Sequence, residues 1–405
     1  MRIRSVTIGT SVSFPPLAGL FRALELFQRQ ARIRFRQAGL EVQTVRLATQ
    51  PFPDILSGQG SDQATPLAQA LEGRCRVEGV DYVSVGPATA LRPDDDLAYI
   101  EVVPEIIRRT ESVFASVLVA SRDSGISLEA IAKAAEAIVA IAHSTPDGFG
   151  NLRLAVLANC KAGSPFFPAS YHLGSDPSFS IATEAADLAV TAFSGVASLG
   201  EARARLRGLI EEKSRIIEEV GQTLQDDFRL RFGGIDFSLA PFPETARSIG
   251  YAIERLGVET FGSSGTLFAV AFLKRAIEEA QFKRCGFSGV MLPVLEDRTI
   301  AELTGQDVLT LDSLLLYSTV CGTGLDTIPL PGDVTLEELS AILLDVATLS
   351  LVADKPLTAR LMPIPGKGAG ERTEYDFPYF ANARVLDVRA RGASKIFGQN
   401  AFLQW

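Results

Sequence analysis

Histidine and cysteine are scarce in this sequence, and the few that occur are scattered. The 405 residues include two histidines and four cysteines, and no two cysteines form a C-x-x-C pair. This spacing argues against a zinc knuckle and against a disulfide framework. Unpaired cysteines are typical of the reducing cytoplasm, where we expect the protein to reside.

Long apolar runs and basic clusters are also missing. No stretch approaches the roughly 18 uninterrupted apolar residues of a membrane-spanning helix, and the start, MRIRSVTIGTSVSF, lacks the continuous apolar segment of a signal peptide. The net charge is −9, whereas phosphate backbones are bound by clustered lysine and arginine. We therefore expect a small-molecule ligand, with no nucleic-acid partner and no membrane contact.

Hydrophobic residues are plentiful: they make up 47% of the chain, against 21% charged residues. A chain of this length and composition can bury a large core without disulfides or a structural metal. No linker rich in proline, glycine or serine divides it, and large α/β barrels reach this size as one unit. We predict a single domain, and we expect it to form a homo-oligomer.

The hydrophobic period predicts two sets of strands separated by helices. The first set comprises RIRSVTIGT, VQTVRLAT, DYVSVGP, SVFASVLVA and LRLAVLAN; the second comprises GIDFSLA, GVMLPV, LTARLMP and ARVLDVRA, with a less regular fifth near LLLYS. Ser127 is the expected N-cap of a helix that follows the fourth strand. Two helices, FSIATEAADLAVTAFSGV and the one that begins at SLGEARARL, are predicted between the sets.

Alternation of strand and helix indicates a parallel sheet with right-handed crossovers. We predict an α/β fold, specifically a ten-stranded α/β barrel with two five-stranded halves. Its parts are a half-barrel over 1–160, a helical insertion over 161–230, a second half-barrel over 231–390 and a C-terminal tail over 391–405.

The loop SPFFPASYH ends in one of the two histidines and follows the carboxyl end of a predicted strand, where α/β proteins place ligands. His172 titrates near neutral pH and is a candidate acid or base, with Tyr171 beside it as a candidate substrate contact. Packing of the loop's aromatic residues is the structural alternative. The other histidine, His143, is expected to complement the C-terminal end of a helix.

Asp236 stands in the otherwise apolar run FGGIDFSLAPFPE. A buried carboxylate needs a partner or a ligand, so Asp236 is a candidate functional residue; capping of a neighbouring turn is the structural alternative.

The run VCGTGLDTIPLPGD combines a cysteine, two aspartates and several chain breakers. Gly322 and Gly324 would present Cys321 on an open turn, but no Lys, Arg or His within the run lowers the pKa of its thiol. Asp326 is the stronger candidate, because Asp333 is expected to be the N-cap of the next helix.

Two further segments could contact an anion. Ser263 and Ser264 precede a helix in FGSSGTLFAV, where free N–H groups favour negative charge, although the Walker ending is missing and a plain N-cap by Ser264 explains the serines equally well. The stretch RLMPIPGKGAGERTEYDFP supplies Arg360 and Lys367, the latter on a loop that could cover an anionic ligand; a solvated loop is the structural alternative.

Four of these stretches, RIRSVTIG, SPFFPASYH, RFGGIDFSLAPFP and STVCGTGLDTIPLPGD, resemble the prokaryotic "PFL family", the pyruvate formate-lyase-like proteins. The similarity runs from residue 2 to about residue 370, and the segment after it, 371–405, departs from the family. The resemblance implies a ten-stranded α/β barrel like that of glycyl radical enzymes. The nearest match to a radical-glycine motif, at residues 389–393, keeps the arginine and the glycine but loses the valine and the aromatic residue, so we expect no glycyl radical.

Our leading hypothesis is a non-radical enzyme, lyase-like or hydrolase-like, that acts on a small polar, anionic metabolite inside the barrel. Asp236 and Asp326 would act as general base or hold Mg²⁺ or another divalent cation, His172 would act as acid or base, and Cys321 would line the site and could serve as nucleophile. The alternative is a ligand-binding or regulatory protein on the same fold. A purely structural homo-oligomer is disfavoured, because buried acids and glycine loops are costly in a scaffold.

Overall fold

One large mixed β-sheet organises the chain. The computed structural model describes residues 1–92, 95–306, 308–389, 392–397 and 402–404. Within these residues the strands are β1 (Arg2–Gly9), β2 (Val42–Ala48), β3 (Tyr82–Thr89), β4 (Val113–Ser121), β5 (Gly125–Ser127), β6 (Leu154–Ala158), β7 (Ser178–Glu184), β8 (Arg231–Asp236), β9 (Gly324–Pro331), β10 (Leu357–Ile364) and β11 (Phe402–Leu403). Nine of them follow the order β8-β7-β1-β2-β3-β4-β6-β10-β9, and β5 and β11 lie off this path.

The centre of the sheet is parallel. Strands β1, β2, β3, β4 and β6 pair in parallel, which confirms the five strands predicted in the first part of the sequence. On either side the direction reverses: β7 is antiparallel to β1, and β10 is antiparallel to β6. The outermost strands, β8 and β9, run parallel to their single neighbours.

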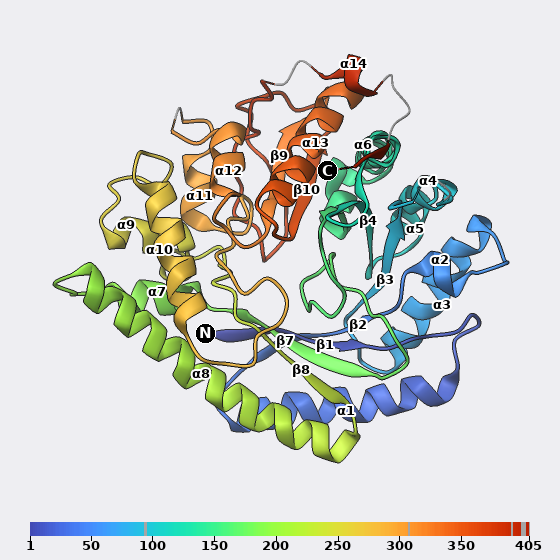
Figure 1. Cartoon of the computed structure of the whole chain (residues 1–405), viewed down its shortest axis with the longest axis horizontal. Helices are drawn as coiled ribbons and strands as arrows, with labels where there is room; N and C mark the ends of the chain where they lie inside the picture. Colours follow the sequence, from blue (N-terminus) through green and yellow to red (C-terminus); the bar gives the residue numbers. More distant parts are fainter. Residues whose placement is uncertain (93–94, 307, 390–391, 398–401, 405) are drawn as a thin grey trace.

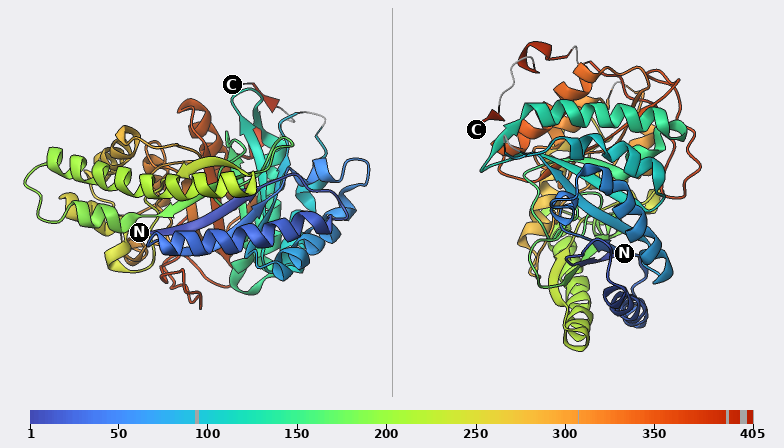
Figure 2. Two further views of the ribbon diagram at one scale, coloured as in Figure 1. Left: turned by 90° about the horizontal axis from the view of Figure 1, so that it is seen from below. Right: turned by 90° about the vertical axis from the view of Figure 1, so that its right-hand side faces the viewer.

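Helices cover the outer face of the curved sheet (Figure 1). The helices of the described residues are α1 (Ala18–Gln37), α2 (Phe52–Ile55), α3 (Ala64–Val77), α4 (Ala98–Glu101), α5 (Val103–Arg109), α6 (Leu128–Ser144), α7 (Ala186–Ala192), α8 (Leu199–Phe228), α9 (Ile249–Leu256), α10 (Thr266–Glu279), α11 (Arg298–Leu303), α12 (Leu311–Tyr317), α13 (Leu336–Val352) and α14 (Ser394–Phe397). Figure 2 shows the two longest, α1 and α8, lying side by side. Among the described residues, no helix combines the length and the apolar character needed to cross a bilayer.

Among the described residues, strand ladders do not close the sheet into a barrel. The predicted ten-stranded barrel is therefore not confirmed, whereas a mixed α/β fold is. The non-strand segment 283–294 lies between the edge strands β8 and β9 and bonds to both. Ile235 N–H donates to the Lys283 carbonyl at 2.7 Å, and Val294 N–H donates to the Asp326 carbonyl at 3.0 Å. The two edges are therefore bridged by irregular chain.

The loop 159–172 fills the concave side of the sheet, in green near the middle of Figure 1. Inward-facing hydroxyls hold it: Ser5 and Thr7 both donate to the Pro165 carbonyl, at 3.4 and 3.1 Å, and Ser84 donates to the Ser170 carbonyl at 2.7 Å. The protein therefore has two apolar regions. The large core packs the outer face of the sheet against the helices, and smaller clusters surround the loop.

Four strands were missed in the sequence: the short β5 and β11, and the longer β7 and β9. Segment 179–196 was predicted as one helix, but Ser178–Glu184 is β7 and only Ala186–Ala192 is helical. The alanines and the acidic residue of this segment are compatible with a helix, so the alternating pattern of β7 was not recognised. The run VCGTGLDTIPLPGD was interpreted as a loop, but Gly324–Pro331 is β9. Its prolines are tolerated because β9 pairs in a ladder on one side only.

Three predicted strands are absent among the described residues. GVMLPV and ARVLDVRA contribute only isolated bridges, at Val290 and Arg384, and the end of ARVLDVRA, residue 390, lies outside the described residues. LLLYS belongs to helix α12. The motif at 389–393 also lies partly outside the described residues.

Of the predicted helix caps, that by Ser127 is confirmed, since its side chain accepts a hydrogen bond from Ala130 N–H. Asp333 does not cap α13; Thr335 does, in a capping box with Glu338. Ser264 does not cap α10, whose N-cap is Gly265.

Candidate functional site

A cavity of about 150 Å³ lies between the sheet and the tip of the inner loop. It is lined by residues near the amino-terminal ends of the parallel strands, such as Tyr82 at the start of β3 and Phe114 near the start of β4, and by Phe166 and Phe167 of the loop. Phe377 and Tyr379, from the C-terminal part of the chain, also line the cavity. The cavity therefore lies at the amino-terminal ends of the parallel strands. The sequence had led us to expect a ligand at the opposite, carboxyl ends.

Four arginines line this cavity: Arg4, Arg46, Arg153 and Arg360. Glu111 and Glu296 are the carboxylates on its wall, and Glu111 is largely exposed at 89%. The local charge is therefore positive in a protein whose net charge is −9.

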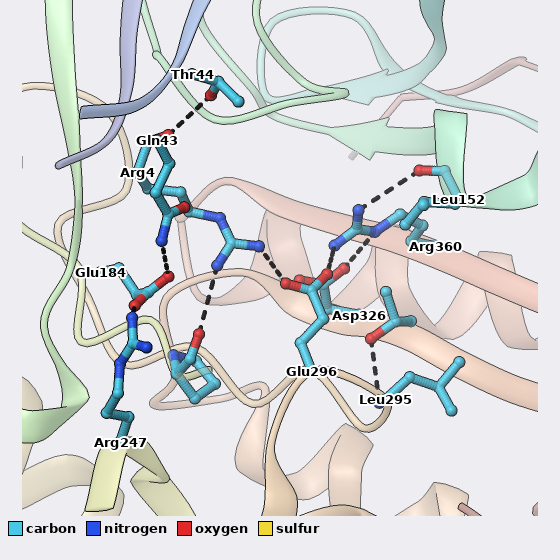
Figure 3. Close-up of polar contacts among 12 residues, drawn as sticks. Arg4, Gln43, Thr44, Leu152, Glu184, Arg247, Leu295, Glu296, Asp326 and Arg360 are labelled. Carbon is cyan, nitrogen blue, oxygen red and sulfur yellow. Dashed lines mark hydrogen bonds and ion pairs between the residues drawn. The ribbon is translucent and has the colours of Figure 1, made fainter. Parts of the chain in front are cut away.

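Two of the arginines belong to a buried ionic chain (Figure 3). Arg4 bonds to one oxygen of Glu296, and Arg360 donates to the other at 2.8 Å. Arg360 also donates from Nε to Asp326 at 2.6 Å. All but Arg4 are at most 5% exposed in their side chains. These four residues form a neutral set of two cations and two anions.

The pKa values of the two acids in the buried ionic chain shift in opposite directions. Burial alone would raise the pKa of Glu296, but the charges of Arg4 and Arg360 bring it below its usual value. For Asp326, burial and the nearby Glu296 charge outweigh the bond from Arg360, so its pKa is raised. Glu296 is accordingly the firmly ionised member of the pair.

A β-bulge places Arg4 in this arrangement. The register between β1 and β7 shifts between Ile3 and Ser5, so Arg4 is an extra residue on β1. A bulge re-aims the side chain it carries, and the Arg4 carbonyl is held by the hydroxyl of Thr44 at 2.8 Å. Arg4 can therefore reach Glu296, which lies 292 positions away in the sequence.

A second ionic group lies nearby, also visible in Figure 3. Glu184, at the end of β7, accepts hydrogen bonds from Gln43 and from Arg247. The guanidinium of Arg247 lies 4.0 Å from the ring centre of Phe242, and burial together with the charge of Arg2 lowers its pKa to about 10. This group supports the wall of the cavity through Gln43, which lines it.

Arg46 makes the fewest hydrogen bonds of the four cavity arginines. Its Nε donates to Thr44 at 2.8 Å, and its guanidinium lies 5.7 Å from the ring centre of Tyr82 and 5.0 Å from that of Phe167. Within the described part of the chain, no carboxylate pairs with it and its two terminal nitrogens have no hydrogen-bond acceptor. Burial, with the charge of Arg4, lowers its pKa to about 10, so it remains a cation at neutral pH.

Arg153, by contrast, is occupied by backbone. Its terminal nitrogens donate to the carbonyls of Ile107 and Val113 at 2.7 and 3.1 Å, and to the hydroxyl of Thr110. It therefore has a structural task at the end of α5, and Arg46 alone offers a free pair of N–H₂ groups.

The four predicted catalytic residues do not meet in this cavity. Asp326 is the nearest, through its bond to Arg360. Asp236 is fully buried and accepts from the N–H groups of Phe287 and Ser288 at 2.9 and 2.8 Å, which matches the structural alternative for it, although burial raises its pKa.

His172 and Cys321 lie elsewhere. His172 bonds through Nε2 to the Gly174 carbonyl at 2.9 Å and packs against Gly9 at the end of β1; burial lowers its pKa. The thiol of Cys321 is buried and accepts from Gly324 N–H at 3.3 Å. No hydrogen bond or ion pair joins any two of these four residues, all of which are described.

Of the predicted substrate contacts, Arg360 lines the cavity. Tyr171 donates to the Cys160 carbonyl inside the loop at 3.0 Å, and Lys367 pairs with Glu374 at 3.0 Å. The other four also lie outside the lining: Ser263 bonds to the Thr260 carbonyl, Ser264 is exposed, Gly322 packs on Gly289, and Gly324 adopts a φ of +99° beside the Thr358 carbonyl.

Residues 1–378 match the family described as "Uncharacterised ACR (DUF711)". The chain belongs to this family. It is 30% identical over 379 residues to the UPF0210 protein of Methanopyrus kandleri, covering 87% of this chain and 81% of the relative. With the UPF0210 protein of Desulforudis audaxviator it shares 30% identity over 373 residues, covering 89% and 82%.

These matches correct the resemblance to the pyruvate formate-lyase-like family, because the family found is DUF711 and its curated relatives carry the UPF0210 name. The four short stretches that suggested the earlier assignment were too brief to identify a family. The region matched to DUF711 includes all four cavity arginines and Glu296.

Metal ligands do not gather in this DUF711 protein: among the described residues, no three His, Cys, Asp or Glu side chains come together in a way that could hold an ion. The predicted ligands, Asp236 and Asp326, have separate partners, backbone N–H groups in one case and Arg360 in the other. The donor set therefore does not fit the divalent cation considered from the sequence.

Sequence reasoning missed Arg4, Arg46, Tyr82 and Glu296. The first two carried a usable signal, since each is an arginine inside a strand whose neighbours alternate toward a buried face. Glu296 follows an apolar run with no such pattern, and only the fold brings it to Arg4.

Proposed function

We propose that this protein binds a small anionic metabolite in the arginine-lined cavity and carries out acid–base chemistry on it without a radical. The observation that carries the proposal is the state of Arg46. It is held on Thr44 and beside two aromatic rings, yet has two terminal nitrogens without an acceptor among the described residues. A planar guanidinium presented in this way suits a carboxylate or a phosphate oxygen pair.

Charge balance supports the same conclusion. Arg4 and Arg360 are paired with Glu296 and Asp326, whereas Glu111 is 89% exposed and lies 3.6 Å from Arg76. Among the described residues, neither Arg46 nor Arg153 pairs with a carboxylate, and Arg153 donates to two carbonyls and a hydroxyl instead. A partly buried, unpaired cation is costly unless a ligand supplies the counter-charge.

The chemistry would fall to Tyr82 and Glu296, which both line the cavity. Burial raises the pKa of Tyr82, although the charge of Arg46 opposes this, so its hydroxyl stays protonated and can donate a proton. Glu296 is ionised and can accept one, but its two arginine partners make it a weak base. That weakness favours the second candidate function, ligand binding without turnover.

Binding is tested by calorimetry and thermal melting with acetate, phosphate and sulfate. We expect at least one anion to stabilise the parent protein, Arg46→Met to lose that effect, and Arg36→Met to keep it, because Arg36 is exposed on α1, away from the cavity. An equal response of the parent and the Arg46→Met variant would refute the anion site.

Chemistry is tested separately, by proton NMR of a bound ligand in D₂O. An acid–base enzyme should exchange a carbon-bound proton next to the anionic group, and Tyr82→Phe should slow this while preserving binding. If every ligand that binds stays unchanged in the parent, the binding-protein alternative holds.

A further inference from the structure

The size, lining and charge of the cavity together define a narrower class of ligand. We propose that the site takes a compact aromatic or branched apolar monocarboxylate, of about the size of benzoate, in place of a sugar phosphate or a strongly polar acid. This inference rests on the proposed function, because it assumes that Arg46 holds the anionic group.

The volume sets the size of the ligand. The cavity measures about 150 Å³, and an apolar cavity of about this volume is known to accept benzene. A single six-membered ring or a branched chain of similar bulk therefore fills it, and a fused two-ring system exceeds it.

The walls set the polarity of the body. Tyr82 and Phe114 meet edge to face with centroids 5.2 Å apart, and Phe114 and Phe167 do so at 5.3 Å. Phe149, Phe166 and Met291 add further apolar surface. An aromatic ring gains from offset or edge-to-face contact with such walls, whereas the many hydroxyls of a sugar would be left without partners.

The charges set the anionic group. Of the two cavity arginines that pair with no carboxylate among the described residues, Arg46 and Arg153, it is Arg46 that has two terminal nitrogens without an acceptor, and these match the two oxygens of a carboxylate. A phosphate monoester carries about −1.5 to −2 at neutral pH and would bring excess negative charge close to Glu296, which lines the same cavity.

The parent protein can be tested without any variant, by calorimetric titration with benzoate, acetate, 1-naphthoate, phenyl phosphate and benzyl alcohol. We expect benzoate to bind about tenfold or more tighter than acetate, because the ring adds buried apolar area. Naphthoate should bind more weakly than benzoate because of its size, phenyl phosphate because of its charge, and benzyl alcohol because it lacks charge.

Two variants test whether benzoate binds in this cavity, one through its carboxylate and one through its ring. Arg46→Met should lower benzoate affinity about tenfold or more, with Arg36→Met as the unchanged control. Ala182→Leu, at a small residue of the lining, should weaken benzoate more than acetate, because it reduces the room for the ring.

The outcomes separate the two proposals. If phenyl phosphate or inorganic phosphate binds more tightly than benzoate and depends on Arg46, the monocarboxylate class is wrong and the anion site stands. If naphthoate binds as well as benzoate, the size limit is wrong. If no anion depends on Arg46, both the ligand class and the proposed function fail.

Discussion

Replacing Arg360 with methionine removes the cation shared by two buried carboxylates. In the folded protein Arg360 bonds to Asp326 at 2.6 Å and to Glu296 at 2.8 Å, with side chains that are at most 5% exposed. Breaking a buried ion pair by deleting one partner costs about 3–5 kcal/mol, because the other charge is left without compensation. Since Glu296 keeps Arg4, most of the penalty falls on Asp326, and we expect a loss of about 3 kcal/mol.

The loss should shrink in acid. Without Arg360, the pKa of Asp326, already raised by burial, rises further. A group whose pKa is higher in the folded than in the unfolded state stabilises the fold at low pH, and this contribution is lost as the pH rises through the folded value. The difference between the Arg360→Met variant and the parent should therefore be larger near pH 7 than near pH 5.

The assay is urea unfolding followed by circular dichroism at both pH values. The control is Arg298→Met, which removes a solvent-exposed pair with Glu302 and should cost less than about 1 kcal/mol. The double variant Arg360→Met with Asp326→Asn should recover part of the loss, because it removes the uncompensated charge. An Arg360→Met variant within about 1 kcal/mol of the parent, or a double variant less stable than the single one, would refute this reasoning.

Three further predictions concern positions outside the ionic chain. Burial lowers the pKa of His172, so His172 contributes stability above its unfolded pKa of about 6.5, and this stability is lost as the pH falls. The His172→Gln variant should therefore lose less stability than the parent between neutral pH and about pH 5. Urea midpoints that are the same for the parent and the variant at both pH values would contradict this. Asp236→Ala leaves the partly buried Phe287 N–H and the buried Ser288 N–H without an acceptor and should cost about 3 kcal/mol, while anion affinity measured by calorimetry stays unchanged. Gly148→Ala should destabilise by more than about 3 kcal/mol, because its Cβ would lie 2.1 Å from the Pro363 carbonyl; Gly366→Ala, with a similar φ of +81° and open space, should cost only about 1–2 kcal/mol in thermal or urea unfolding.

The sequence predicted the parallel centre of the sheet well, because its signals are local. Strands β1, β2, β3, β4 and β6 each show alternation or a continuous apolar run, and the first three are followed directly by a helix. Strands β7 and β9 escaped prediction for physical reasons. β7 runs into an alanine-rich helix, and the whole segment 179–196 is compatible with one helix; the prolines of β9 are tolerated only because the strand lies at an edge of the sheet.

The candidate site was predicted only in fragments. Asp326 and Arg360 were both identified, but as separate contacts, with Asp326 on a predicted loop, whereas they face each other across neighbouring strands. The pairing of Arg4 with Glu296 joins residues 292 positions apart and depends on a bulge in β1. Sequence spacing does not report such long-range geometry.

The inner loop has a consequence for how this family could diverge. Phe166 and Phe167 shape the cavity, yet they belong to small clusters that are distinct from the large core between the sheet and the helices. Substitutions at these two positions can therefore alter which molecule fits without weakening the packing that maintains the fold. Ligand preference and folding stability are in this way placed under largely independent selection, so relatives with the same sheet could evolve toward different ligands by changing only the loop.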